Sequence, residues 1–267
     1  MKIYISADME GITGVTHWDE VEHEKPTSFL QFQDRMTKEV SAACLGANEA
    51  GAKEIWVKDA HYSGRNILAE SLPNNARLIR GWSGHPYSMV QEIDSSFDAL
   101  IMIGYHSRAS SSGNPLAHTM SSSKLDKVLI NEQAASEFFL HGHIASKYKV
   151  PIVFLSGDAG ICDEVKKVSP NTKIHATMVG VGNSTISTHP EESRIAIKSK
   201  VKDALSGNLN KCIWKHPKSF TLQVRFIKQQ FAYKASHYPG VSMIDPKTVY
   251  LSTSDYDEIM RFFLFNV

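Results

Sequence analysis

The stretch that decides the fold is KIYISADMEG, residues 2–11. It begins with an apolar, strand-like run, KIYIS at 2–6, and ends with two carboxylates, Asp8 and Glu10, followed by a glycine. Acidic side chains rarely gather at the end of a buried strand without a positively charged partner. The stretch therefore predicts an interior strand whose carboxyl end faces a cation.

Similar apolar runs recur over the first two-thirds of the chain and alternate with helix-like segments. The runs lie at 54–59, 76–81, 98–104, 127–131 and 150–157. Several are continuously apolar, as expected for strands buried on both faces of a parallel sheet. Amphipathic patterns at 29–51 and 133–149 predict helices between them. This alternation predicts an α/β fold with a doubly wound, largely parallel sheet and helices on both of its faces.

The pattern changes after about residue 185. Residues 189–205 read as a long helix with Pro190 near its first turn. The run FTLQVRFI at 220–227 alternates like a half-exposed strand, and TVYLST at 248–253 precedes a final helix. We therefore expect an α/β metal-binding catalytic domain at 1–185 and a smaller α+β domain at 186–267.

Composition narrows the class of protein. The formal net charge of the 267 residues is only +1, so no global field attracts the chain to nucleic acid or to an anionic membrane. No apolar run approaches the roughly 20 residues that span a bilayer. The three cysteines are scattered and odd in number, which argues against a disulfide framework. We expect a cytoplasmic protein that binds neither nucleic acid nor membrane.

Side chains that commonly bind metals follow the predicted strands. They are Asp8 and Glu10, Asp59 and His61, His106, Glu132 and Glu137, and Asp158. Ligands of open α/β sheets bind beyond the carboxyl ends of the strands. Residues two apart in an extended chain point to the same side, so neighbours such as Asp8 and Glu10 can converge. Carboxylates and imidazoles suit zinc, manganese and non-haem iron, and this edge of the sheet is predicted to bind metal.

Several of these residues also have a purely structural interpretation. Asp59 can cap a turn or orient His61, and Asp158 can cap a helix. His85 can lie in a turn or line a pocket. His141 and His143, in the sequence HGH, fall on a predicted helix, where residues two apart diverge by about 200°. We therefore exclude that pair as a metal site.

Five short motifs resemble, in order and approximate spacing, those of the bacterial zinc D-aminopeptidases of the dipeptide-operon type. They are SADMEG at 6–11, DAH at 59–61, GYHSRAS at 104–110, AHTM at 117–120 and INEQAASE at 130–137. The resemblance implies two zinc ions per subunit, with Asp8 bridging both. It implies that Glu10 and His61 complete one metal site and that His106 and Glu137 complete the other.

The same resemblance implies that His118 is the catalytic histidine, as a nucleophile or as a general acid or base. It also implies a homo-oligomer, a decameric ring. The sequence departs from the family pattern at Ala60, Tyr62, Ala159 and Asn183, none of which is an expected metal ligand. We therefore expect metal-dependent hydrolysis, with substrate recognition as the property that differs.

We expect a dinuclear zinc aminopeptidase that acts on short peptides or amino-acid amides. Substrates with an N-terminal D-residue are one alternative within this class. One rival is a two-metal amidase or phosphoesterase acting on another small molecule. A second is a non-catalytic peptide-binding protein of a transport operon. Nucleotide binding through VGVGNST at 179–185 lacks the fingerprint spacing of glycines and the following acidic residue.

Overall fold

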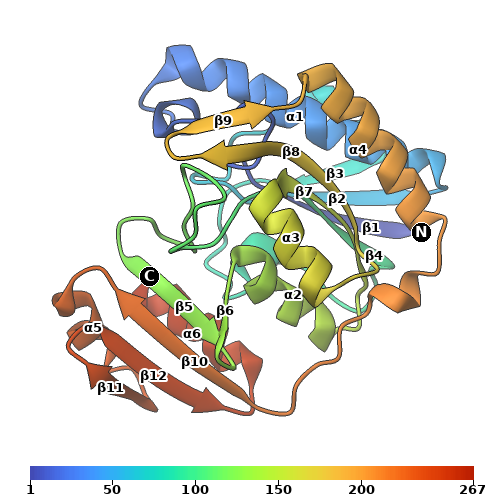
Figure 1. The fold of residues 1–267 in the computed structure, drawn as a ribbon. Helices are drawn as coiled ribbons and strands as arrows, with labels where there is room; N and C mark the ends of the chain where they lie inside the picture. The colour runs from blue at the N-terminus through green and yellow to red at the C-terminus, as the bar shows by residue number, and fades with distance from the viewer.

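A computed structural model describes residues 1–267 and contains two β-sheets (Figure 1). The larger sheet has seven strands in the order β3-β2-β1-β4-β7-β8-β9. Its strands are β1 (Lys2–Ala7), β2 (Glu54–Asp59), β3 (Ala76–Ile79), β4 (Ala99–Tyr105), β7 (Ile152–Asp158), β8 (Lys173–Val181) and β9 (Ser184–Ser187). All neighbours pair in parallel except β8 and β9, which form an antiparallel hairpin.

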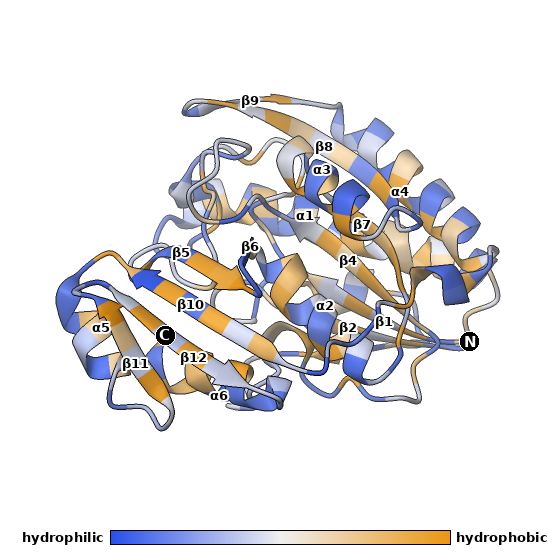
Figure 2. Cartoon of the chain, turned by 60° about the horizontal axis from the view of Figure 1, so that its bottom comes forward, coloured by the Kyte–Doolittle hydropathy of each residue, from blue (hydrophilic) through white to orange (hydrophobic).

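Helices cover both faces of this sheet. They are α1 (Pro26–Glu49) and α4 (Pro190–Leu205) on one face, and α2 (Glu137–Lys147) and α3 (Ala159–Val168) on the other. Alternate residues of β1 enter the two cores: Ile3 and Ile5 pack with α1 and α4, whereas Tyr4 packs with α2 and α3. Figure 2 shows hydrophobic residues concentrated in the strands and hydrophilic stripes on the outer sides of the helices. The expected doubly wound α/β fold is confirmed.

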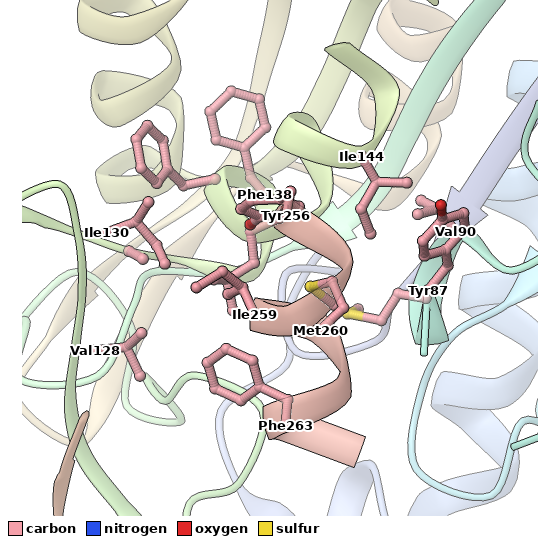
Figure 3. Packing of buried hydrophobic residues seen from close by; sticks show 14 of the residues in the cluster. Tyr87, Val90, Val128, Ile130, Phe138, Ile144, Tyr256, Ile259, Met260 and Phe263 are labelled. Atoms are coloured by element: carbon pink, nitrogen blue, oxygen red, sulfur yellow. The ribbon is translucent and has the colours of Figure 1, made fainter. Parts of the chain in front are cut away.

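The smaller sheet is antiparallel and has the order β11-β12-β10-β5-β6. Its elements, with two helices beside it, are β5 (Leu125–Ile130), β6 (Gln133–Ala134), β10 (Phe220–Phe226), α5 (Gln229–Ala235), β11 (Val241–Asp245), β12 (Thr248–Thr253) and α6 (Tyr256–Asn266). Figure 3 shows Ile259, Met260 and Phe263 of α6 in the hydrophobic core that this sheet shares with α2.

Two expectations about the chain between 125 and 149 were wrong. The strand expected at 127–131 forms, but it is β5 of the small sheet and not a parallel strand of the large one. The reason is its alternation: Val128 and Ile130 are buried while Lys127 is exposed, as suits an antiparallel sheet with one solvated face. The helix expected at 133–149 begins later, at Glu137, because residues 133–134 pair with β5.

The two sheets do not separate at residue 185. Strands β5 and β6 precede that position yet belong to the small sheet, and α4 follows it yet packs on α1. The expected domain boundary therefore does not coincide with the division between the sheets. None of the helices is both long and apolar enough for a membrane span.

The strand order reverses direction beside β1, which lies between β2 and β4. Ligands of open α/β sheets bind in the crevice at such a point. Gly104 has a positive φ of 70°, and a Cβ atom there would collide with the carbonyl oxygen of Asp8. A glycine at the end of β4 thus lets the two strand ends approach closely, and β1, β2 and β4 deliver their following residues to one place.

Candidate metal centre

The structure brings all six expected site residues together at this crevice. Asp8 and Glu10 follow β1, His61 follows β2, and His106 follows β4. Glu137 is the first residue of α2, and His118 lies on the loop between β4 and β5. Every one of these side chains is buried except that of His118, which is partly exposed.

The six side chains form two groups that share Asp8. In the first, Nδ1 of His61 lies 3.2 Å from Oδ1 of Asp8 and 3.1 Å from Oε2 of Glu10. In the second, Nε2 of His106 lies 3.5 Å from Oδ2 of Asp8 and 3.3 Å from Oε2 of Glu137. The candidate ligand atoms within each group lie within 4.8 Å of one another. Asp8 thus offers one oxygen to each group, which is how a bridging carboxylate binds two ions.

Backbone carbonyls fix the imidazole tautomers. Nε2–H of His61 donates to the carbonyl oxygen of Val21 at 2.7 Å. Nδ1–H of His106 donates to the carbonyl oxygen of Ser107, and Nδ1–H of His118 donates to that of Leu116, both at 2.9 Å. Since a carbonyl can only accept, it takes the N–H of one nitrogen, and the second nitrogen of each ring faces the carboxylates, where the neutral ring offers its lone pair to a metal ion. Metal-binding histidines are commonly oriented in this way.

Three buried atoms of the centre lack a hydrogen-bond partner. They are Oδ2 of Asp8, Oε2 of Glu10 and Nε2 of His106. Buried polar atoms without partners are rare in folded proteins, because each costs the free energy of its lost hydration. All three are electron-pair donors directed at the same space, so the residues present fit a pair of divalent cations.

The charges of the centre are strongly coupled. Burial and the nearby carboxylate of Glu10 raise the pKa of Asp8 well above its usual value. Burial acts in the same direction on Glu137, but His106 outweighs it and lowers the pKa of Glu137 to about 2. Carboxylate neighbours likewise outweigh burial at His61 and raise its pKa. Three buried carboxylates with little access to water require positive charge nearby, supplied either by protons or by metal ions.

His118 stands beside the two groups. Its Nε2 lies 3.6 Å from Oε1 of Glu137 and 4.0 Å from Oε1 of Glu10. Burial and the neighbouring His106 lower the pKa of His118 below its usual value. Its ring also contacts Trp18, with centroids 5.5 Å apart. It can also form a third group of candidate ligands with Glu10 and His106, so geometry allows both a role toward substrate and a role toward metal.

The other residues that the sequence offered as metal ligands have structural roles or lie at the surface. Asp59 accepts hydrogen bonds from the backbone N–H groups of Asn66 and Ile67, and so caps the turn after β2. Asp158 caps α3 by accepting from Ile161 N–H at 2.9 Å. Glu132 is exposed at the turn between β5 and β6.

The remaining histidines also lie outside the centre. Nδ1 of His85 accepts from Tyr87 N–H within a turn, and His85 also lines a separate cavity of about 300 Å³. His141 and His143 are buried on α2, outside every group of candidate metal ligands.

Three supporting contacts could not be found in the sequence. Asn114 donates from Nδ2 to the carbonyl oxygen of Glu10 at 3.0 Å and to Asp158 at 3.1 Å. Met120 N–H donates to Oε1 of Glu137 at 2.6 Å. The third is the Val21 carbonyl that holds His61. Two of the three supporting residues, Met120 and Val21, act through their backbone atoms, which carry no sequence signal.

A cavity of about 450 Å³ gives access to the centre. Its wall includes aromatic side chains, Trp18, Tyr62 and Trp82, and a run of serines at 121–123. No lysine or arginine lines it. The cavity is large enough for a short peptide.

The known proteins that this chain resembles are D-aminopeptidases. A solved Zn-dependent D-aminopeptidase of Bacillus subtilis, DppA, described as a self-compartmentalizing protease, superposes with a TM-score of 0.91 at 28% identity, over 99% of this chain and 96% of that one. A D-aminopeptidase of Bacillus subtilis (strain 168) is 31% identical over 186 residues, which are 70% of this chain and 66% of that protein. The family model described as D-aminopeptidase matches residues 1–265. The chain therefore belongs to the D-aminopeptidase family of peptidases, as its motifs indicated.

Proposed function

We propose that this protein is a dinuclear zinc aminopeptidase that removes amino-terminal residues, including D-residues, from short peptides or amino-acid amides. The observation that supports this best is the position of Asp8, whose two oxygens face two separate histidine–carboxylate groups. The fold relative is a Zn-dependent D-aminopeptidase, which supports zinc as the metal.

In this proposal Asp8 would bridge the two ions. Glu10 and His61 would complete one site, and His106 and Glu137 would complete the other. Zinc ions held as such a pair activate water and polarise the carbonyl group of an amide. The Val21 and Ser107 carbonyls keep His61 and His106 in the tautomers that bind metal, and Met120 N–H and Asn114 hold the positions of Glu137 and Glu10.

His118 acts on the substrate in this proposal. Its Nε2 carries no proton and faces the cavity, so it can accept a proton and pass it to the leaving amine, or attack the carbonyl carbon itself. Its lowered pKa keeps the ring neutral at neutral pH, which either role requires.

The residues that line this cavity also bear on the two rival functions. Lysine or arginine side chains commonly surround the phosphate in a phosphoesterase, and the lining holds neither, which favours a peptide substrate. A non-catalytic binding protein does not need a complete set of metal ligands, a bridging carboxylate and a free imidazole. The presence of all three together favours an enzyme.

The experiment is metal analysis combined with a substrate screen. The purified protein is assayed for bound zinc, and hydrolysis of L- and D-aminoacyl amides, dipeptides and a phosphate monoester is measured in parallel. We expect two zinc ions per chain and release of amino acids. Full activity at one ion or fewer per chain would contradict the dinuclear centre, and binding of peptides without turnover would favour a transport role.

Assembly and location complete the proposal. We expect a homo-oligomer, as a decameric ring, because the fold relative is self-compartmentalizing. Sedimentation of the purified protein tests the subunit number. We also expect a cytoplasmic location, which the three buried, unpaired cysteines support. Cell fractionation tests that expectation.

A further inference from the structure

A second cavity, of about 300 Å³, shares part of its wall with the catalytic cavity. The residues common to both are Trp82, Ser88, Met120 and Ser121. Beyond this common wall one side of the lining is apolar and comes from α6 and the residue after it, and the other side comes from the segment after β3. The residues are Met260, Phe263, Leu264 and Val267 on the first side and Gly84, His85, Pro86 and Gln91 on the second. No Asp, Glu, Lys or Arg side chain lines the second cavity. Its chemistry therefore differs from that of the metal centre, although the two cavities are adjacent.

Contacts with neighbouring residues hold the common wall in place. Met120 has a positive φ of 62°, which directs its N–H to Glu137 while its side chain lines both cavities. Nε1–H of Trp82 donates to the carbonyl oxygen of Tyr62 at 2.8 Å, and Nζ of Lys58 lies 3.9 Å from the centre of a Trp82 ring. A non-glycine residue keeps a left-handed conformation only where its surroundings enforce it. The wall next to the metal centre is thus preformed.

The apolar part of the lining combines buried and exposed side chains. Met260 and Phe263 of α6 are buried in the core that also contains Tyr87, and Figure 3 shows Met260 on the side of α6 that faces Tyr87. Leu264, the next residue along α6, leaves 41% of its surface exposed, and Trp82 leaves 42% exposed. An apolar group in the cavity would cover these exposed surfaces. A volume of about 300 Å³ lies at the lower end for ligand sites, so a single side chain is the fitting occupant.

We propose that this cavity is a subsite for the side chain of a substrate residue next to the scissile bond, so that the enzyme prefers peptides with a large apolar side chain at that position. We call it the apolar subsite and define it by Trp82, Met120, Met260, Phe263 and Leu264. The inference rests on the proposed peptidase function, because its occupant is part of the peptide held at the metal centre.

The test compares two substitutions on neighbouring residues of α6. Leu264→Trp narrows the apolar subsite, whereas Phe265→Trp adds an indole at a position that is 63% exposed and lines neither cavity. The substrates are dipeptides of alanine and phenylalanine with phenylalanine at either position, in L and D forms. Binding of free alanine and phenylalanine to the zinc-loaded protein is measured by calorimetry as a readout that needs no turnover.

For the wild type we expect kcat/KM to rise about 10- to 100-fold when phenylalanine replaces alanine at one of the two positions. Leu264→Trp should bring this ratio close to one, and Phe265→Trp should keep the wild-type ratio. A ratio near one in the wild type, or an equal change in both variants, would overturn the subsite while leaving peptide hydrolysis established.

If no dipeptide is cleaved, the proposed function fails and calorimetry decides the subsite alone. Phenylalanine should then bind at least about tenfold more tightly than alanine, and Leu264→Trp should remove the difference. Equal binding of the two amino acids would overturn the subsite. A change of subunit number in Leu264→Trp would show that a neighbouring copy, not substrate, fills the cavity, and would also overturn it.

Discussion

The imidazole rings of His106 and His118 stack with their centroids 4.3 Å apart and their planes inclined by 16°. The Nε2 atoms of both rings approach Glu137. The two side chains differ in access, since His106 is 1% exposed and His118 is 12% exposed. His106 is therefore enclosed among the carboxylates, and His118 is the ring that a substrate in the cavity can reach.

Replacement of His118 by alanine should separate chemistry from metal binding. We expect His118→Ala to keep its two zinc ions and its assembly, because Asp8, Glu10, His61, His106 and Glu137 remain. Turnover should fall by about 10²-fold or more, the usual effect of losing a positioned acid or base. Zinc content and kcat are measured on the same preparation.

The control for this variant is His237→Ala, which removes an exposed imidazole at the end of α5 and should leave both readouts unchanged. Loss of one zinc ion in His118→Ala would make His118 a metal ligand. Near-normal turnover would show that it is only a loop residue.

Replacement of the shared carboxylate should empty both metal sites. We expect Asp8→Ala to lose most of both zinc ions, because its two oxygens face the two groups. Glu10→Ala should lose mainly one, since Glu10 lies closest to His61. Zinc per chain after dialysis against a weak chelator is the measurement. Equal losses in the two variants would contradict a bridging role for Asp8.

The two glutamates near the start of α2 should differ sharply. Glu137→Gln should abolish activity, because Glu137 lies 3.3 Å from His106 inside the centre. Glu132→Gln should cost less than about tenfold, or about 1.4 kcal/mol of barrier, because Glu132 is exposed on the turn after β5. Steady-state kinetics of both variants provide the comparison. The opposite ranking would reverse the assignment of the ligand.

The sequence predicted the part of the site that depends on local geometry. Asp8 and Glu10 converge because they follow an interior strand, and His61 and His106 arrive from the two strands beside it. Strand periodicity and the rule for sheet edges suffice for these four. Glu137 was expected at the same edge, but the route assumed for it was wrong: it reaches the centre from α2 after the chain has passed through the small sheet.

The parts that could not be predicted depend on contacts between distant segments. The alternation of Val128 and Ile130 with Lys127 suits an antiparallel sheet but does not identify the partner strand, and pairing with β10, about 100 residues later, places this strand in the small sheet. The carbonyl of Val21 and the N–H of Met120 support the metal ligands through backbone atoms, which every residue type has. Such contacts appear only when the fold is known.

A buried glutamate outside the centre gives a prediction about stability. Glu39 of α1 is fully buried; its Oε1 accepts from Thr13 N–H at 3.1 Å, and its Oε2 has no partner. Burial raises the pKa of Glu39 from 4.5 to about 7, against the opposing effect of the Thr13 hydrogen bond. The folded protein therefore keeps this proton over a pH range in which the unfolded chain has released it.

The sign of the pH dependence follows from proton counts. Between about pH 4.5 and pH 7 the unfolded chain binds fewer protons at this position, so the free energy of unfolding falls as pH rises and then levels off. At about 1.4 kcal/mol per pH unit, the difference between 4.5 and about 7 corresponds to at most about 3 kcal/mol. Glu39→Gln keeps the acceptor for Thr13 and removes the charge. The free energy of unfolding of Glu39→Gln, relative to that of the wild type, should therefore rise between pH 5 and pH 8.

Denaturant unfolding of wild type and variant at the two pH values measures this difference, in which the contributions of metal and assembly cancel. Glu49→Gln is the matched control, because Glu49 lies on the same helix, is exposed, and has a pKa lowered by Lys198 and Lys202. Removing that charge should give no gain in stability at pH 8. A gain at pH 8 in both variants would point to net charge as the cause, and an unchanged pH dependence in Glu39→Gln would show that Glu39 is already ionised in the folded protein at pH 5.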